Sequence, residues 1–430
     1  MNAARPADLS LAQRGRAASL RADDLRRHNL AVVAHHVAAR GGVSRAELAR
    51  LTHLTKATIS TYVQELLRVG LLVELGAQPA GRVGRPHSVL AMNGERHCGV
   101  GIELNVDYVA VCVDDLLNRV RFHRVEAVDN RGIEPSRVLD RTARLLDTAL
   151  QAAAAEGLEP AGIAVALPGA VEVASGRLLI APNLGWTEVA VTDELVFRLG
   201  RLGLPVVADN EANLAALGEL WLGIGAESGD YVHVSSEIGV GAGIVVGGAL
   251  FRGARGFAGE VGHVVIDPDG PACTCGGRGC LEQIAGQDAI LRSAGLPATT
   301  ASTLGRAGNP LRELVERLER GEKTALDAVA DAAVALGIGL ADVVNLIDPD
   351  TIILGGTYAS LVRWLREPLQ ASLARQVIGS KGRPLQIRRS VLGPDAAVRG
   401  AASLVIQHVL SEPGALGSGA ASAASASRPL

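Results

Sequence analysis

The stretch that organises the chain runs from Glu260 to Glu282 and reads EVGHVVIDPDGPACTCGGRGCLE. It holds three of the five cysteines of the chain within eight residues, and a histidine precedes the first of them by ten positions. Thiolate and imidazole groups suit Zn²⁺, and four such ligands close a tetrahedral structural site. Glycines at positions 276, 277 and 279 allow the tight turn that one shared ion requires. We therefore predict a zinc loop over residues 263–280, with the ligands His263, Cys273, Cys275 and Cys280.

A loop with free or paired thiols is the alternative to a zinc site. A disulfide between Cys273 and Cys275 would be badly strained, and an odd cysteine would be left over. A zinc-dependent hydrolase is disfavoured, because its metal needs an open position and four protein ligands leave none. The metal is therefore expected to be structural and to present Glu260 and Glu282 to a hydroxyl-rich ligand.

The pattern Glu-x-Gly-His at residues 260–263, followed by Cys-x-Cys-Gly-x-x-Gly-Cys-Leu-Glu at residues 273–282, resembles the ROK family of repressors, open reading frames and sugar kinases. The resemblance extends from about residue 25 to about residue 408. It implies an α/β fold, with an N-terminal winged helix-turn-helix followed by a two-lobed, actin-like ATPase (ribonuclease-H-like) body. We expect a flexible arm at 1–23, the DNA-binding domain at 24–93, the ROK sugar-sensing domain at 97–410 and a disordered tail at 411–430.

Composition sets the class of the protein. A chain of 430 residues predicts two or three domains. Hydrophobic residues make up 48% but aromatic residues only 3%, so Ala, Val, Leu and Ile must build the cores. No run of eighteen apolar residues and no secretory signal is apparent, which predicts a cytoplasmic protein without a membrane partner. Thiols stay reduced in the cytoplasm and can bind metal there.

Charge divides the chain into a basic beginning and an acidic remainder. Residues 1–98 carry 14 Lys or Arg and 7 Asp or Glu, a net charge of +7, whereas the remainder carries a net charge of −10. A basic module on an acidic body predicts a polyanion partner for the first segment only. On charge alone, a chance distribution over the surface is the alternative.

The segment from Asp24 to about Val69 has the periodicity of a helix-turn-helix module. Its first helix places Leu25, Leu30, Val33, His36 and Val37 on one side and ends at Gly41-Gly42. Ser44-Arg-Ala-Glu47 predicts a capping box for a short second helix, and Thr55 caps the third. The exposed face of the third helix offers short polar groups to phosphates and base edges, so we predict DNA contacts from Thr55, Lys56, Thr58, Ser60, Thr61 and Gln64.

A hairpin or wing is expected after the third helix. Its tip carries Arg82 and Arg85 between glycines and before a proline, and an arginine with small neighbours can enter a narrow minor groove. A three-helix protein–protein module with a polar face is the alternative, but charge, wing and polar helix together favour DNA. By the resemblance, ROK repressors carry such a winged module, whereas the kinases generally lack it.

Two hairpins that would hold ATP phosphates in a ROK kinase are altered here. Where the kinases carry Asp-x-Gly-Gly-Thr, this chain reads Glu103-Leu-Asn105-Val106, and bulky side chains occupy the space of a phosphate. Where the kinases carry Gly-Thr-Gly-Ile-Gly-Gly-Gly, it reads Glu237-Ile-Gly-Val-Gly-Ala-Gly, which adds an acid and removes a hydroxyl. The later Gly355-Gly356 turn, which cups the nucleotide in the kinases, is expected to be inherited architecture.

The resemblance also implies a sugar pocket. Asn183 and Asn210 match the sugar-contacting asparagines of the family, and Glu211 stands at the position of the catalytic Asp of the kinases. One extra methylene misplaces a base by about an ångström, which can cost about a hundredfold in rate. Trp186 could pack under a sugar ring, with core packing as the alternative. The predicted sugar-binding set is Asn183, Asn210, Glu211, Glu260, His263 and Glu282, and no catalytic residue is expected.

Together these features predict a sugar-responsive DNA-binding transcriptional regulator, a repressor, whose ROK domain binds a monosaccharide or derivative without kinase activity. The run Asn210-Glu-Ala-Asn-Leu-Ala-Ala resembles the xylose-type repressors of the family. Expected partners are operator DNA, a monosaccharide effector and further copies of the chain, as a homodimer or a dimer of dimers. The alternative is an ATP-dependent sugar kinase with an appended DNA-binding module. Xylose, glucose, N-acetylglucosamine and their phosphates all present hydroxyls that the set could meet.

Overall fold

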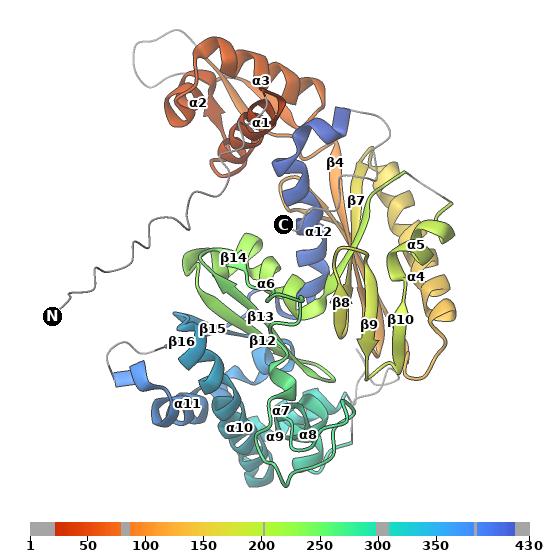
Figure 1. Cartoon of the computed structure of the whole chain (residues 1–430), viewed down its shortest axis with the longest axis vertical. Coiled ribbons are helices and arrows are strands. Elements are labelled where there is room, and N and C mark those ends of the chain that lie inside the picture. Colours follow the sequence, from red (N-terminus) through yellow and green to blue (C-terminus); the bar gives the residue numbers. More distant parts are fainter. Residues whose placement is uncertain (1–21, 79–86, 201–202, 298–308, 382–384, 418–430) are drawn as a thin grey trace, which may run out of the picture. The chain divides into compact units, whose positions relative to one another are not determined.

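The computed structural model of the chain describes residues 22–78, 87–200, 203–297, 309–381 and 385–417 (Figure 1). The chain divides into two compact units. The first runs to Ala91 and also takes in residues 410–417, and the second spans residues 92–409.

The first unit is a small helical module with a three-stranded sheet. Ser44 caps one helix by accepting the amide of Glu47, and Thr55 caps the next by accepting the amide of Thr58, each at 3.2 Å, so both predicted caps are confirmed. The elements are α1 Ala22–Ala38, β1 Val43–Ser44, α2 Arg45–Thr52, α3 Lys56–Arg68, β2 Leu72–Gln78 and β3 His87–Met92, with sheet order β1-β3-β2.

Side chains from all three helices build the core of this unit, including Leu30, Val33, Leu48 and Ile59. The expected inward position of Leu25 is wrong. That side chain is 48% exposed, because α1 begins at Ala22 and its first turn extends beyond the core.

The first lobe of the second unit is built on a five-stranded sheet with the order β11-β7-β4-β5-β6. Strand β7 pairs in parallel with β4 and β11, whereas β4-β5 and β5-β6 are antiparallel. A second, three-stranded sheet has the order β10-β9-β8. The elements are β4 His97–Leu104, β5 Tyr108–Asp115, β6 Val120–Ala127, α4 Pro135–Ala155, β7 Glu159–Leu167, β8 Ala170–Glu172, β9 Arg177–Ala181, β10 Trp186–Val189, α5 Val191–Arg198 and β11 Val206–Asn210.

The second lobe repeats this plan on a five-stranded sheet with the order β14-β13-β12-β15-β16. The remaining elements of the chain, in order, are α6 Glu211–Leu222, η2 Ile224–Glu227, β12 Tyr231–Ser236, β13 Val240–Val246, β14 Ala249–Leu250, η3 Val261–His263, α7 Leu281–Ala285, α8 Gln287–Ser293, α9 Pro310–Glu319, α10 Lys323–Ile347, β15 Thr351–Gly355, α11 Gly356–Gln376, η4 Ile378–Lys381, β16 Gln386–Arg389, η5 Gly393–Asp395, α12 Ala396–Ser411 and η6 Pro413–Gly417. Two lobes of this kind confirm the expected fold class.

Helix α12 returns to the sheet of the first lobe (Figure 1). A Cβ atom at Gly101 in β4 would lie 2.0 Å from the carbonyl oxygen of Val398, so only glycine lets the helix pack this closely. The N-terminal end of α12 therefore has a fixed position beside the β4–β5 hairpin.

One expected boundary differs from the structure. The sequence predicts disorder from residue 411, yet α12 continues to Ser411 and the 3₁₀ helix η6 follows it against α1 within the first unit. Residues 1–21 of the expected arm and 418–430 of the expected tail lie outside the described residues.

Helix α10 is long and apolar enough to cross a membrane by length and composition alone. In this structure 56% of its most apolar window is buried, and Val329, Leu336 and Leu340 lie fully inside the core of the second lobe. The helix packs along α11. Its apolar character is therefore accounted for by its place in the core.

Candidate functional site

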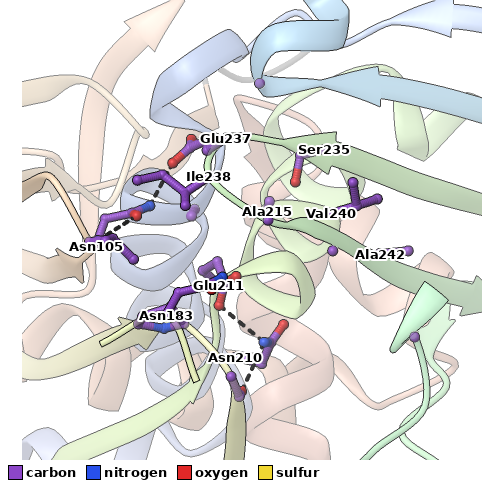
Figure 2. A pocket seen from close by; sticks show the side chains of 18 of the residues that line it. Asn105, Asn183, Asn210, Glu211, Ala215, Ser235, Glu237, Ile238, Val240 and Ala242 are labelled. Atoms are coloured by element: carbon purple, nitrogen blue, oxygen red, sulfur yellow. Dashed lines mark hydrogen bonds between the residues drawn. The ribbon is translucent and has the colours of Figure 1, made fainter. Parts of the chain in front are cut away.

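A pocket lies within the second unit, between the hairpins and loops of the two lobes. The first lobe contributes the β4–β5 turn, the loop with Asn183 and the start of α6, and the second contributes the β12–β13 hairpin and the segment before η3. All six predicted sugar-binding residues line it: Asn183, Asn210, Glu211, Glu260, His263 and Glu282. Figure 2 shows Asn183, Asn210 and Glu211 near one another, with Asn105 and Glu237 in another part of the pocket.

Asn210 is held at the N-terminus of α6 by its own side chain. Its Oδ1 atom accepts the amides of Ala212 and Asn213 at 2.8 and 3.2 Å, which is the geometry of a helix N-cap. Its Nδ2 atom donates to the carbonyl of Gly169 and to Glu211 Oε2, both at 3.0 Å (Figure 2). The amide and the neighbouring carboxyl group therefore reach the pocket in a fixed relation.

Asp209 and Arg252 support this corner, and sequence reasoning missed both. Asp209 Oδ1 accepts the amide of Asn210 at 2.8 Å and the side chain of Asn213 at 3.1 Å. Asp209 Oδ2 forms a largely buried ion pair with Arg252 at 2.5 Å. The two residues are 43 positions apart, so no local pattern could have indicated the pair.

The predicted zinc loop, residues 263–280 (the metal loop below), contacts the pocket residue Asn183 and is followed directly by the pocket residue Glu282. Thr274, between two of the predicted ligand cysteines, donates to Asn183 Oδ1 at 3.3 Å. Glu282 Oε2 accepts the amide of Val240 at 3.3 Å. A Cβ atom at Gly239 would lie 2.4 Å from that same oxygen, so a larger residue at this position would displace the Glu282 carboxyl group. Thr274 and Gly239 were not predicted as site residues.

The four predicted metal ligands come together. The candidate ligand atoms of His263, Cys273, Cys275 and Cys280 all lie within 4.8 Å of one another. The Sγ atoms of Cys275 and Cys280 are 3.7 Å apart, close to the edge of about 3.8 Å in a tetrahedron with metal–sulfur bonds of about 2.3 Å. This cluster could hold a metal ion.

The surroundings of Cys275 and Cys280 shift the pKa values of the two thiols in opposite directions. The amide of Gly277 is the main cause that lowers the pKa of Cys275. Burial raises the pKa of Cys280 to about 12, and a bound dication would be needed to deprotonate that thiol. His263 lies with Nδ1 at 3.8 Å from Cys273 Sγ and also lines the pocket, so one side chain joins the cluster to the site.

The two hairpins at the other part of the pocket are joined by side chains. Asn105 Nδ2 donates to Glu237 Oε2 at 2.5 Å (Figure 2). The Tyr108 hydroxyl lies 3.0 Å from the same oxygen. Tyr108 also donates to Glu103 Oε1 at 2.5 Å. The hairpins therefore enclose a buried network of two carboxyl groups, a phenol and an amide.

Burial dominates the protonation of the pocket acids. It is the main cause that raises the pKa values of Glu103 and Glu237, and the charge of Glu103 adds to the shift at Glu237. Burial, with the charges of Glu260, Glu103 and Glu237, raises the pKa of Glu211 well above its usual value. Burial therefore favours the protonated form of Glu211.

Trp186 does not line the pocket. It is 3% exposed, lies in the core of the first lobe and donates from Nε1 to the carbonyl of Ile133 at 2.8 Å. Core packing is thus the correct interpretation of this tryptophan.

The predicted DNA-contacting residues of α3 fall into two groups. Thr55, Lys56, Ser60, Thr61 and Gln64 are exposed. Thr58 is half-buried, because its hydroxyl lies 2.8 Å from that of Thr55 in the cap. Arg82 and Arg85 lie outside the described residues, between β2 and β3.

Comparison with known proteins decides the family. The sequence profile of the ROK family matches residues 100–408. The chain belongs to the ROK family. The xylose repressor of Caldicellulosiruptor bescii (strain ATCC BAA-1888) is 31% identical over 377 residues, which cover 86% of this chain and 93% of that protein.

Two solved structures extend the comparison of this ROK protein. A ROK family transcriptional regulator, a homolog of the E. coli MLC protein, has a TM-score of 0.75 at 27% identity and covers 90% of this chain and 97% of its own. A ROK family glucokinase from Streptomyces griseus in complex with glucose and AMPPNP has a TM-score of 0.60 at 30% identity and covers 71% of this chain and 98% of its own. The resemblance inferred from the cysteine motif and the two-lobed, actin-like body are thereby confirmed.

Proposed function

We propose that this ROK protein is a sugar-responsive transcriptional repressor that has no kinase activity. The observation that carries the proposal is the network between the two hairpins, in which Asn105 and Tyr108 meet Glu237. Side chains and carboxyl groups fill the place where the resemblance to the kinases puts the phosphates of ATP. The other part of the pocket keeps the amides and carboxyl groups that bind hydroxyls.

The position of the catalytic base supports the same proposal. Phosphoryl transfer to a hydroxyl needs a carboxylate that accepts its proton. Burial raises the pKa of Glu211, which favours the protonated form, and a protonated carboxyl group cannot accept the proton of a hydroxyl. A sugar would be bound here without being activated.

The first unit is proposed to read the operator. The xylose repressor match covers 86% of the chain, whereas the glucokinase structure covers 71%. The exposed face of α3, with Lys56, Ser60 and Gln64 at successive turns, would enter the major groove. Thr55, Thr58, Thr61 and the wing residues Arg82 and Arg85 complete the proposed contact set.

The cysteine cluster is proposed to hold a structural Zn²⁺ through His263, Cys273, Cys275 and Cys280. The ion would supply a fixed anchor for the loop that bears Thr274 and for the start of α7, where Glu282 lies. The chain would thereby hold Asn183 and Glu282 in the geometry that a sugar needs.

Regulation is proposed to proceed through paired DNA-binding units. A helix-turn-helix protein reads two half-sites as a dimer, so we propose a homodimer or a dimer of dimers in the cytoplasm. A sugar between the lobes would change operator affinity only if it binds the two states of the dimer unequally.

Two measurements on the full chain test the proposal. A duplex selected from a random library should bind with nanomolar affinity, and a panel of pentoses and hexoses should contain a sugar that shifts this affinity at least about tenfold. Transfer of labelled phosphate from ATP to the same sugars should be absent. Turnover of ATP with a sugar would instead support a kinase with an appended DNA-binding module.

A further inference from the structure

The pocket carries an unusual balance of charge. Five carboxyl side chains line it: Glu103, Glu211, Glu237, Glu260 and Glu282. Among the described residues that line the pocket, none is Lys or Arg. The pocket therefore contains hydrogen-bond partners for hydroxyls but no guanidinium or ammonium group.

The nearby cationic side chains do not offset these acids. Arg252 forms its ion pair with Asp209 outside the pocket lining. His233 lines the pocket, but burial lowers its pKa to about 4, so it is neutral. His263 faces the cysteine cluster through Nδ1. Neither Arg252 nor His233 thus offers a positive charge to a ligand.

Both parts of the pocket are acidic, so a phosphate group would meet a carboxyl group in either orientation of a ligand. Glu103 and Glu237 lie at the hairpins, and their charges reach Glu211. Glu260 and Glu282 lie beside the metal loop, where His263 is close to both. A phosphate group on any hydroxyl would come close to at least one carboxyl group, and a carboxyl group that takes up a proton still offers no positive charge.

We infer that the effector of this protein is an unphosphorylated sugar and that the five-carboxylate pocket excludes the corresponding sugar phosphate. The inference rests on the proposed sugar-responsive function and names the chemical class of its ligand. Phosphate adds a charge of about −1.5 to −2 near pH 7. Burying it against carboxylates without a cationic partner is expected to weaken binding at least about 100-fold.

The test compares matched pairs by calorimetry on the full chain: glucose with glucose 6-phosphate, N-acetylglucosamine with its 6-phosphate, and xylose with xylose 5-phosphate. Each pair is measured with and without Mg²⁺, because a divalent cation could bridge a phosphate to a carboxylate. We expect at least one neutral sugar to bind, and its phosphate to bind at least about 100-fold more weakly in both conditions.

Variants connect the discrimination to the hairpin acids. Above the pKa of about 8 of Glu237, where this side chain is ionised, Glu237→Gln and separately Glu103→Gln should reduce the ratio of the two affinities within the binding pair, whereas Glu227→Gln, on the surface beside Arg388, should leave that ratio unchanged. A sugar phosphate that binds as tightly as its neutral partner would overturn the inference and leave the repressor function standing. If no member of the panel binds or shifts operator affinity, the proposed function is overturned together with the inference.

Discussion

The Thr274 hydroxyl donates a hydrogen bond of 3.3 Å to Oδ1 of Asn183, which joins the metal loop of one lobe to the pocket amide of the other. Thr274 lies between Cys273 and Cys275, so its position depends on the turn that the cysteines close. An amide whose oxygen is held in this way has a defined orientation, and its Nδ2 atom is directed by the same contact. The Thr274 side chain thus connects the cysteine cluster to the proposed sugar site, beside the links through His263 and Glu282.

Thr274→Val removes this hydrogen bond and keeps the size and branching of the side chain. The residue is exposed, so we expect a loss at the low end of the usual range, about threefold in sugar affinity (about 0.7 kcal/mol). Calorimetric titration measures the affinity, and a metal assay on the same sample should still find one zinc per chain. An unchanged sugar affinity would show that Asn183 is held by other contacts.

Cys275→Ser removes one thiolate from the cluster. We expect zinc content to fall well below one per chain, and both sugar affinity and the response of operator binding to sugar to fall with it. Cys98→Ala is the matched control. Cys98 is buried in β4 and is not part of the cluster, so this variant should keep the zinc content of the parent chain. Full retention of zinc and of sugar response in Cys275→Ser would contradict the proposed role of the loop.

Features whose physical cause is local could be predicted from the sequence. The caps at Ser44 and Thr55 each involve residues three positions apart, and the four metal ligands fall within eighteen residues. Glu282 was predicted from its place beside the cysteine motif, whereas Asn183 was found through the family resemblance, because a single position of this kind has no periodicity of its own.

Features that depend on tertiary packing could not be predicted. Asn105 and Glu237 are 132 residues apart, and the bond between them follows only from the way the two lobes face each other. Composition also misled at the C-terminus. The segment after Ser411 is rich in small residues, which predicts disorder, yet Pro413 is buried and η6 packs within the first unit.

Lys56→Ala tests the proposed DNA-binding face of α3. Lys56 is exposed at the first turn of the helix, where a phosphate contact would contribute a salt-dependent term. We expect weaker operator binding and a slope of log K against log salt that is smaller by about one. Lys323→Ala, in α10 of the second unit, should leave both quantities unchanged. If Lys56→Ala kept the slope of the parent chain, Lys56 would not contact a phosphate of the operator.

Glu237→Gln should make stability less dependent on pH. Burial, with the charges of Glu103 and Asp107, raises the pKa of Glu237 above its value in the unfolded chain, against hydrogen bonds from Tyr108 and Asn105 that lower it. The folded chain therefore binds more protons, and the free energy of unfolding falls as pH rises from about 5 through the folded pKa.

The neutral amide that Glu237→Gln introduces cannot lose a proton, so this contribution disappears in the variant. Between about pH 5.5 and 8 the slope of stability against pH should flatten by up to about 1.4 kcal/mol per pH unit, as measured by denaturant unfolding. Glu227→Gln on the surface should retain the slope of the parent chain. Parallel curves for the parent and Glu237→Gln would mean that Glu237 is ionised throughout this range.

Arg252→Met tests the ion pair that supports the pocket corner. Asp209 is 2% exposed, and removal of its partner leaves a buried carboxylate with only the amide of Asn210 and the side chain of Asn213. Breaking a buried pair on one side costs about 3 kcal/mol or more, whereas replacing both partners with neutral groups costs less.

We therefore expect the double variant Asp209→Asn/Arg252→Met to be more stable than Arg252→Met alone. Denaturant unfolding of the parent chain, the two single variants and the double variant gives the coupling energy of the pair. Sugar affinity supplies a second readout, because Asp209 also holds the amide that precedes α6 and hence the position of Asn210. Equal stability of Arg252→Met and of the double variant would contradict a stabilising role for the contact between Asp209 and Arg252.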